Sequence, residues 1–143
     1  MKTRTLLLLC LLIGFPTTQL SAQTLKKGAV IAVNTYTFTL NPDVTMNQFL
    51  DFYINKYIPE YEKNFPGVKE YVLWGDRGEK KNQISIMDIF ESVAVRDKYY
   101  PTEGSEGSDV AKAAQEKMNA INEEVGKFFV SGGIRTYTDW IIK

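Results

Sequence analysis

Stretches that favour β-strands and stretches that favour helices follow one another along this chain in an order that few folds can accommodate. Residues 29–40 (AVIAVNTYTFTL) are rich in Val, Ile, Thr and aromatic residues and predict a first strand. Residues 68–74 and 83–91 predict two more strands, which the polar stretch 75–82 (GDRGEKKN) joins as a hairpin. Residues 134–142 predict the last strand.

A helical pattern fills the interval between the first two strands. Thr45 and Gln48 have the spacing of a capping box, which predicts the N-terminus of this helix. Apolar residues then recur at helical spacing as far as Phe65. Pro59 has no backbone N–H to donate, so we expect a kink or an early end there.

Two more helical patterns follow the third strand. Ser92 predicts the start of a short helix through Tyr100, the stretch 102–108 (TEGSEGS) predicts a flexible loop, and residues 109–130 predict a long amphipathic helix. With the last two helices counted as one connection, the order is the split βαβ, or ferredoxin-like, arrangement. The prediction is therefore an α+β fold with a four-stranded antiparallel sheet and all helices on one face.

Alternation along each strand assigns its side chains to the two faces of the sheet. We expect the helices to cover the face with the larger side chains, which are Val30, Ala32, Asn34, Tyr36, Phe38, Leu40, Ile84, Ile86, Asp88 and Phe90. The opposite face is too apolar to be left in water, so a second copy of the chain is expected to cover it in a homodimer. The alternative is a two-layer monomer with an open, semi-apolar face.

Two strongly polar residues interrupt the face that meets the helices. Asn34 and Asp88 lie on strands that are neighbours in this topology, and a buried carboxylate is costly unless it is hydrogen-bonded or paired. A pocket between sheet and helices would explain both, since small-molecule sites combine apolar walls with a few polar groups. The predicted ligand-binding residues are Asn34, Tyr36, Asp88, Phe90 and Tyr100.

A structural explanation of Asp88 competes with the pocket. The carboxylate would then bond local backbone groups, or pair with Arg96 or Arg135, and no ligand would be involved. The residues Arg135, Tyr137 and Asp139 alternate on one face of the last strand, where we expect an exposed sheet edge in preference to a polar rim.

Residues 1–22 predict where the protein works. Lys2 and Arg4 precede an apolar run at residues 6–15, and Leu20-Ser21-Ala22 resembles a signal-peptidase site. The apolar run is too short to span a bilayer, so we expect a cleaved signal and no membrane segment in the mature chain. The expected product is one domain, residues 23–143, exported to the periplasm or secreted.

Composition excludes several kinds of chemistry. The chain has no His, and Cys10, its one Cys, falls inside the predicted signal. A His-ligated haem, a Cys/His zinc site and a nucleophile activated by His are therefore excluded, and we expect neither a metal nor a cofactor. Without Lys2 and Arg4, 15 basic residues remain against 17 acidic ones, a balance that argues against nucleic acid as a partner.

The chain resembles the dimeric α+β barrel superfamily, which includes antibiotic-biosynthesis-type and haem-degrading monooxygenases. The resemblance spans nearly all of residues 29–143 and rests on the element order, the strand-then-Pro opening at 36–42 and the corner at 89–92 that leads into the helix. It implies a dimeric barrel with a substrate between sheet and helices. In the oxygenase branches an Asn on the first strand frames the substrate, and Asn34 matches it by register.

Most of the other oxygenase residues are missing from this chain. Phe90 occupies the position of the Trp that ends the third strand, and Ile86 that of a second Asn. The His that the haem-degrading branch requires is absent.

Three functions follow as hypotheses. The first is an exported homodimeric module that binds a small apolar or aromatic molecule. The second is an enzyme, a cofactor-independent oxygenase or an isomerase-like protein, with Asp88 as general base. The third is a structural or interaction protein of the cell envelope.

Overall fold

The computed structural model describes residues 25–103, 106–131 and 135–143. The predicted signal at residues 1–22 lies outside the described residues. So do residues 104–105 of the predicted loop and the expected start of the last strand at residue 134.

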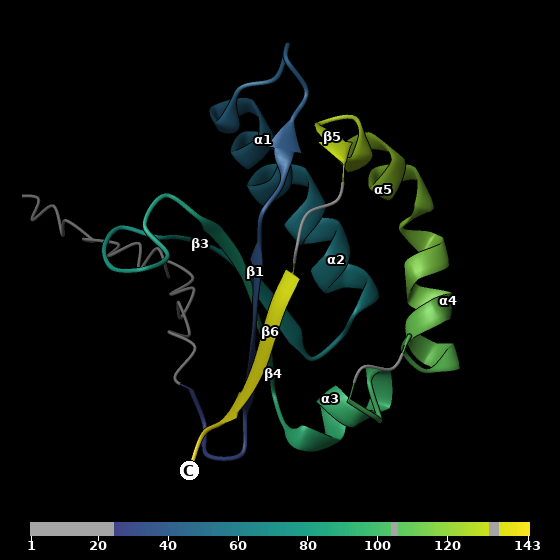
Figure 1. The fold of residues 1–143 in the computed structure, drawn as a ribbon. Helices are drawn as coiled ribbons and strands as arrows, with labels where there is room; N and C mark the ends of the chain where they lie inside the picture. Colours follow the sequence, from purple (N-terminus) through teal and green to yellow (C-terminus); the bar gives the residue numbers. More distant parts are fainter. Residues whose placement is uncertain (1–24, 104–105, 132–134) are drawn as a thin grey trace, which may run out of the picture.

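Four long strands form one antiparallel sheet (Figure 1). They are β1 (Val30–Tyr36), β3 (Val68–Trp74), β4 (Ile84–Phe90) and β6 (Arg135–Ile141), in the order β3-β4-β1-β6. Each neighbouring pair is antiparallel. This order, with helical connections on one face, is the predicted ferredoxin-like α+β fold.

The first helical segment runs without interruption through three parts. These are α1 (Met46–Phe52), a π-helical turn η1 (Tyr53–Tyr57) and α2 (Ile58–Asn64). The predicted capping box is present, because the Thr45 side chain accepts from the backbone N–H of Gln48 and the Gln48 side chain accepts from that of Thr45.

The expectation that the helix would end early at Pro59 is wrong, since α2 continues to Asn64. The turn before Pro59 is widened, and the backbone N–H of Ile58 donates to the carbonyl of Tyr53, five residues back. A π-helical turn relieves the α-helical hydrogen-bond pattern at the point where proline cannot follow it.

The remaining helices are α3 (Val93–Tyr99), α4 (Asp109–Lys117) and α5 (Asn119–Gly126). The single helix predicted over residues 109–130 is therefore wrong in two respects. The helix breaks at Met118, whose side chain is fully buried, and it ends at Gly126.

A small second sheet replaces the end of the predicted helix and the end of the predicted first strand. β2 (Thr39–Leu40) pairs with β5 (Phe129–Ser131), apart from the main sheet. Phe129 packs against Phe38 and Phe49 there, with ring centroids 4.8 and 5.1 Å away. These aromatic contacts favour the extended conformation over another helical turn.

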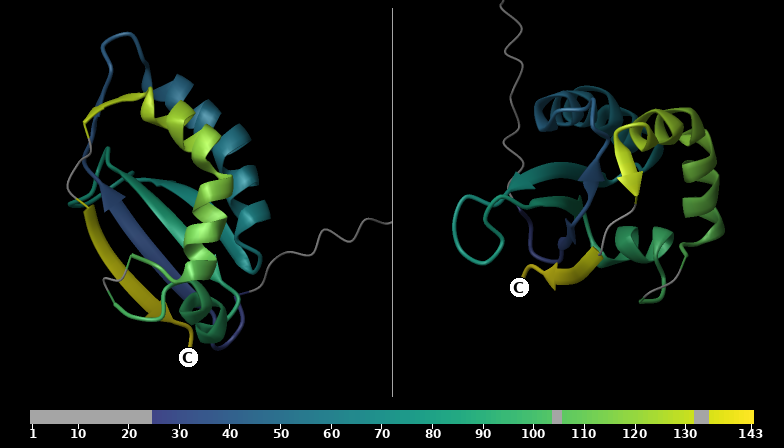
Figure 2. Two further views of the ribbon diagram at one scale, coloured as in Figure 1. Left: turned by 90° about the vertical axis from the view of Figure 1, so that its right-hand side faces the viewer. Right: turned by 45° about the horizontal axis from the view of Figure 1, so that its top comes forward.

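The helices cover the predicted face of the sheet (Figure 2, left). Its buried side chains on β1 and β4 are Val30, Ala32, Asn34, Ile84, Ile86, Asp88 and Phe90. They contribute to two core clusters, one centred on Phe65 and Tyr99 and the other on Phe49.

No element of the described chain lies over the opposite sheet face (Figure 2, left). This open face is lined by half-buried and exposed apolar side chains, namely Ile31, Val33, Tyr71, Leu73, Met87, Ile89 and Trp140. Trp140 is 60% exposed and Tyr71 41% exposed.

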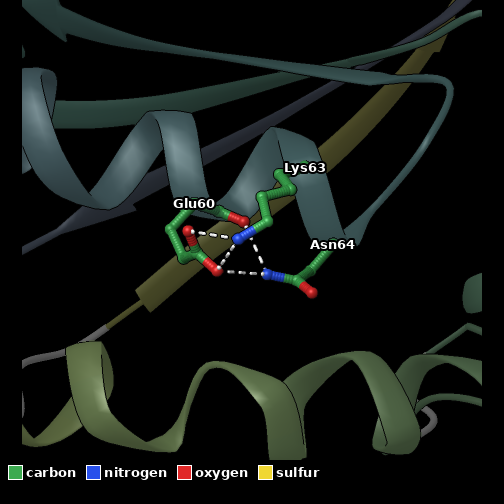
Figure 3. A network of polar contacts seen from close by, with 3 residues as sticks. All are labelled: Glu60, Lys63 and Asn64. Atoms are coloured by element: carbon green, nitrogen blue, oxygen red, sulfur yellow. Dashed lines mark hydrogen bonds and ion pairs between the residues drawn. The ribbon is translucent and has the colours of Figure 1, made fainter.

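A polar network holds the last turn of α2 (Figure 3). Lys63 Nζ donates to both carboxylate oxygens of Glu60, at 3.0 and 3.1 Å, and Asn64 Nδ2 donates to the Glu60 backbone carbonyl and Oε1, at 2.9 and 3.0 Å. The hydrogen bonds from Lys63 and then Asn64 lower the pKa of Glu60. This network is exposed at the helix surface and stabilises the end of α2.

Within the described ranges, no helix has the length and apolar character that crossing a membrane requires. The same residues include no group of three or more Asp and Glu side chains arranged to hold a metal ion.

Candidate functional site

A cleft of about 900 Å³ opens between the sheet and the segment formed by α3 and the residues after it. Side chains of β4, β1 and β6 form one side, among them Asp88, Asn34 and Asp139. The full lining is Asn34, Asp88, Phe90, Arg96, Asp97, Tyr100, Pro101, Thr102, Glu103, Tyr137, Thr138 and Asp139.

Four of the five predicted ligand-binding residues line this cleft, namely Asn34, Asp88, Phe90 and Tyr100. Tyr36 lies elsewhere. It stands opposite Ile84 at the far end of β1 and packs into the aromatic core cluster around Phe49. Tyr137 and Asp139, which were expected at an exposed edge, also line the cleft, so β6 contributes a polar rim as well as an edge.

A row of polar side chains crosses the sheet beneath the cleft. The strand register places Glu70 of β3 opposite Asp88 of β4, Asp88 opposite Ala32 of β1, and Ala32 opposite Asp139 of β6. Directly opposed residues point to the same face of an antiparallel sheet. Three carboxyl groups therefore share one level of the sheet, on the face that the helices cover.

Glu70 is the most deeply buried of these carboxyl groups, at 5% exposure. Its side chain is hydrogen-bonded to Tyr53 and to Asp88. Burial raises the pKa of Glu70 to about 9, and the nearby charge of Asp88 adds to the increase. Glu70 therefore keeps its proton at neutral pH and donates it in the hydrogen bond to Asp88.

Three tyrosines of the first helical segment stack above this acid pair. The Tyr53 and Tyr57 rings have centroids 4.6 Å apart, and Tyr61 continues the stack 6.4 Å beyond Tyr57. Burial raises the pKa of all three hydroxyls well above the usual value, and the charges of Glu70 and Asp88 raise it further. The three hydroxyls therefore remain protonated at neutral pH.

The tyrosine stack begins in the π-helical turn. Tyr53 and Tyr57 are the first and last residues of this turn, and their rings stack almost in parallel, with 16° between their planes. The Tyr53 hydroxyl donates to Glu70, which links the helical layer to the acid pair.

Arg96 closes the cleft where α3 meets β6. Its Nε lies 2.5 Å from Asp97 Oδ1, and its Nη1 lies 2.5 Å from Asp139 Oδ2. The guanidinium is thus held by two carboxylates, and these contacts raise its pKa, with Asp97 as the larger cause. The side chain of Arg135, the other predicted partner of Asp88, lies outside the described part of the chain.

Sequence reasoning did not identify Glu70, Tyr53 or the pair of Arg96 with Asp139. A signal for Glu70 was available, because alternation in β3 places it on one face with Val68 and Val72. The roles of Tyr53 and of the Arg96–Asp139 pair depend on which helices and strands pack together, and local sequence patterns do not show this.

The acid pair and the cleft together offer one chemistry. Asp88 belongs to both, since it accepts from Glu70 and lines the cleft. A carboxylate beside a protonated carboxyl group is able to hold a ligand donor or to accept a proton from a bound molecule.

No family model matches the chain, and no curated protein matches it. The fold does have counterparts among solved structures. A NIPSNAP family protein from Agrobacterium tumefaciens superposes with a TM-score of 0.50 at 10% identity, covering 79% of this chain and 91% of that one.

Two more distant structures have TM-scores below 0.5. A dimeric protein of unknown function and ferredoxin-like fold from Bacteroides fragilis has a TM-score of 0.41 at 14% identity, covering 81% of this chain and 98% of that one. A mutant of SnoaB, a cofactor-independent oxygenase from Streptomyces nogalater, has a TM-score of 0.44 at 11% identity, covering 81% and 94%. At 10% identity, the likeness to the NIPSNAP family protein shows the ferredoxin-like fold alone and transfers no activity to this chain.

Proposed function

We propose that the protein is an exported homodimer that binds a small apolar or aromatic molecule in the cleft between β1, β4, β6 and α3. The observation that carries the proposal is the position of Asp88, which is 8% exposed and lines a cleft of about 900 Å³. Pockets of this size with aromatic walls and a few buried polar groups are typical of small-molecule sites.

Aromatic and polar side chains would have separate tasks in such a site. The Phe90 and Tyr100 rings meet edge to face, with centroids 6.3 Å apart, and present apolar surface to a ring of the ligand. Asn34, which is 4% exposed, and Asp88 would fix the orientation of the ligand through its polar groups.

The homodimer is supported by the open face of the sheet. Apolar side chains of all four strands gather there, and Trp140 and Tyr71 are 60% and 41% exposed. An exposed apolar surface of this kind is stabilised when a second copy of the chain covers it. In an isologous dimer, the same patch of each copy forms the contact.

Native mass spectrometry of residues 23–143, purified from an exporting host, tests the proposal. We expect a dimer that carries one small molecule per chain, and the adduct mass identifies the ligand class. Asn34→Ala and Asp88→Asn should lower retention of the adduct, whereas the exposed controls Asn47→Ala and Asp43→Asn should not. Unchanged retention in folded Asn34→Ala and Asp88→Asn proteins would rule out this cleft as the site.

A second candidate function is supported by the acid pair. Because Glu70 holds a proton next to Asp88, the two groups resemble an acid and a base in contact. An isomerase-like enzyme, or an oxygenase without a cofactor, would use Asp88 to remove a proton from an enolisable aromatic substrate.

Oxygen uptake and solvent-deuterium incorporation with a panel of quinols and catechols test this second function. Turnover that is lost in Asp88→Asn and retained in Asp43→Asn would support it. If no compound of the panel is turned over and the protein still carries its bound small molecule, the enzymatic function is ruled out and the binding function stands.

A further inference from the structure

We infer that the ligand of the cleft is an organic cation, an aromatic molecule with an amine that meets Asp88. This inference rests on the proposed binding function and adds the charge of the ligand to it.

Negative groups outnumber positive ones along the cleft. Among the described lining residues, Arg96 is the one basic side chain, while Asp88, Asp97, Glu103 and Asp139 are acidic. The electrostatic potential in the cleft is therefore negative. It repels an anion and attracts a cation.

The positive charge of Arg96 is already paired with carboxylates and is not available to an anionic ligand. Two of its guanidinium nitrogens are held at 2.5 Å by Asp97 and Asp139, and its side chain is 22% exposed. An incoming carboxylate or phosphate would have to displace one of these carboxylates in order to reach the guanidinium.

Asp88 supplies the group that an amine would contact. Asp88 is only 8% exposed, and the strand register places Glu70 directly opposite it on β3. In the hydrogen bond between them Glu70 is the donor, so the negative charge stays on Asp88, at the cleft. Burial of an unpaired carboxylate away from water costs free energy, and an ion pair with a bound ammonium group would offset that cost.

The aromatic lining is a second, independent feature that suits a cation. Phe90, Tyr100 and Tyr137 line the same cleft as Asp88 and come from β4, the segment after α3, and β6. Aromatic rings attract ammonium groups through their faces, and they also pack against the apolar part of an aromatic amine.

Three probes of nearly one shape test the inference, namely 2-phenylethylamine, 2-phenylethanol and 3-phenylpropionate. Titration calorimetry and amide chemical shifts would measure their affinity and location. We expect the amine to bind at least about tenfold more tightly than the alcohol, a difference of about 1.4 kcal/mol. The carboxylate should be the weakest of the three.

Substitutions separate the charge of Asp88 from the shape of the cleft. Asp88→Asn should reduce the affinity of the amine about tenfold and leave that of the alcohol nearly unchanged, while the exposed control Asp43→Asn changes neither. Equal binding of amine and alcohol in the cleft would overturn the inferred charge and leave the proposed binding function standing. Binding of none of the probes would overturn both, and binding outside the cleft would overturn the site itself.

Discussion

Glu70 lies directly opposite Asp88 on neighbouring antiparallel strands, and a hydrogen bond joins the two carboxyl groups beneath the cleft. The two residues are 5% and 8% exposed, so both carboxyl groups lie largely out of water. Two buried carboxyl groups in contact cannot both ionise without a large cost. One proton therefore belongs to the pair, and Glu70, the more buried member, holds it.

This arrangement predicts how stability depends on pH. Unfolded Glu70 releases its proton near its ordinary pKa of 4.5, whereas folded Glu70 holds it until about pH 9. Between these values the folded state binds more protons, so the free energy of unfolding falls as pH rises, by at most about 1.4 kcal/mol per pH unit. The contribution is complete below pH 4.5 and is lost by the time pH has passed through about 9.

Glu70→Gln should remove this pH dependence, because Gln donates to Asp88 at every pH and does not titrate. Urea unfolding at a series of pH values between 4.5 and 9 measures the slope in the wild type and in the variant. Glu123→Gln, an exposed change on α5, is the matched control and should keep the wild-type slope. An equal slope in wild type and Glu70→Gln would refute the shared proton.

Tyr53→Phe should raise the pKa of Glu70 further, because the hydroxyl of Tyr53 donates to Glu70 and so lowers that pKa. Carboxyl ¹³C chemical shifts of Glu70 across the pH range would report the change directly. The lost hydrogen bond should also cost about 1 kcal/mol of stability. Tyr57→Phe, which removes the next hydroxyl of the stack, should leave the Glu70 titration closer to that of the wild type.

Gly75→Ala should destabilise the β3–β4 hairpin. A Cβ atom at this position would lie 1.8 Å from the backbone carbonyl oxygen of Lys80, so the turn would have to move. We expect a loss of at least about 1 kcal/mol in the free energy of unfolding. Gly126→Ala at the end of α5 meets nothing within 4 Å and should instead stabilise by about 0.5 kcal/mol. Equal effects of the two changes in a denaturation series would contradict the packing of the hairpin.

Arg96→Ala should loosen β6 from α3. The Arg96 and Asp139 side chains are only 22% and 19% exposed, so removal of the guanidinium leaves a poorly solvated carboxylate, at a cost of about 1–2 kcal/mol. Arg77→Ala breaks a pair whose side chains are 94% and 85% exposed and should cost less than about 0.5 kcal/mol. Native-state hydrogen exchange would show faster opening of β6 amides in Arg96→Ala alone.

The sheet was predictable from the sequence because alternation is a local property. Residues 68–74 were expected as a strand and are β3, and the face that carries Asn34 and Asp88 does meet the helices. The same rule would have found Glu70.

Features that depend on contacts between distant segments could not be read from local patterns. The apolar residues near Phe129 continue the helical spacing of residues 109–130, yet they form β5 because Phe38 and Phe49 are close by. Pro59 is accommodated by the π-helical turn before it, which local propensity does not describe. The pairing of Arg96 with Asp139 likewise depends on where β6 meets α3.

The open sheet face gives the last prediction, which concerns the proposed homodimer. Trp140→Glu would place a charge on the apolar patch that a second copy is proposed to cover, and burial of an unpaired carboxylate opposes association. We expect light scattering to report a monomer for this variant and a dimer for the wild type. Val110, on α4 in the helical layer, is also exposed, at 47%, and Val110→Glu is the control that should remain dimeric. A wild-type protein that is monomeric at all concentrations would contradict the homodimer, while the cleft, built within one chain, would still be open to a ligand.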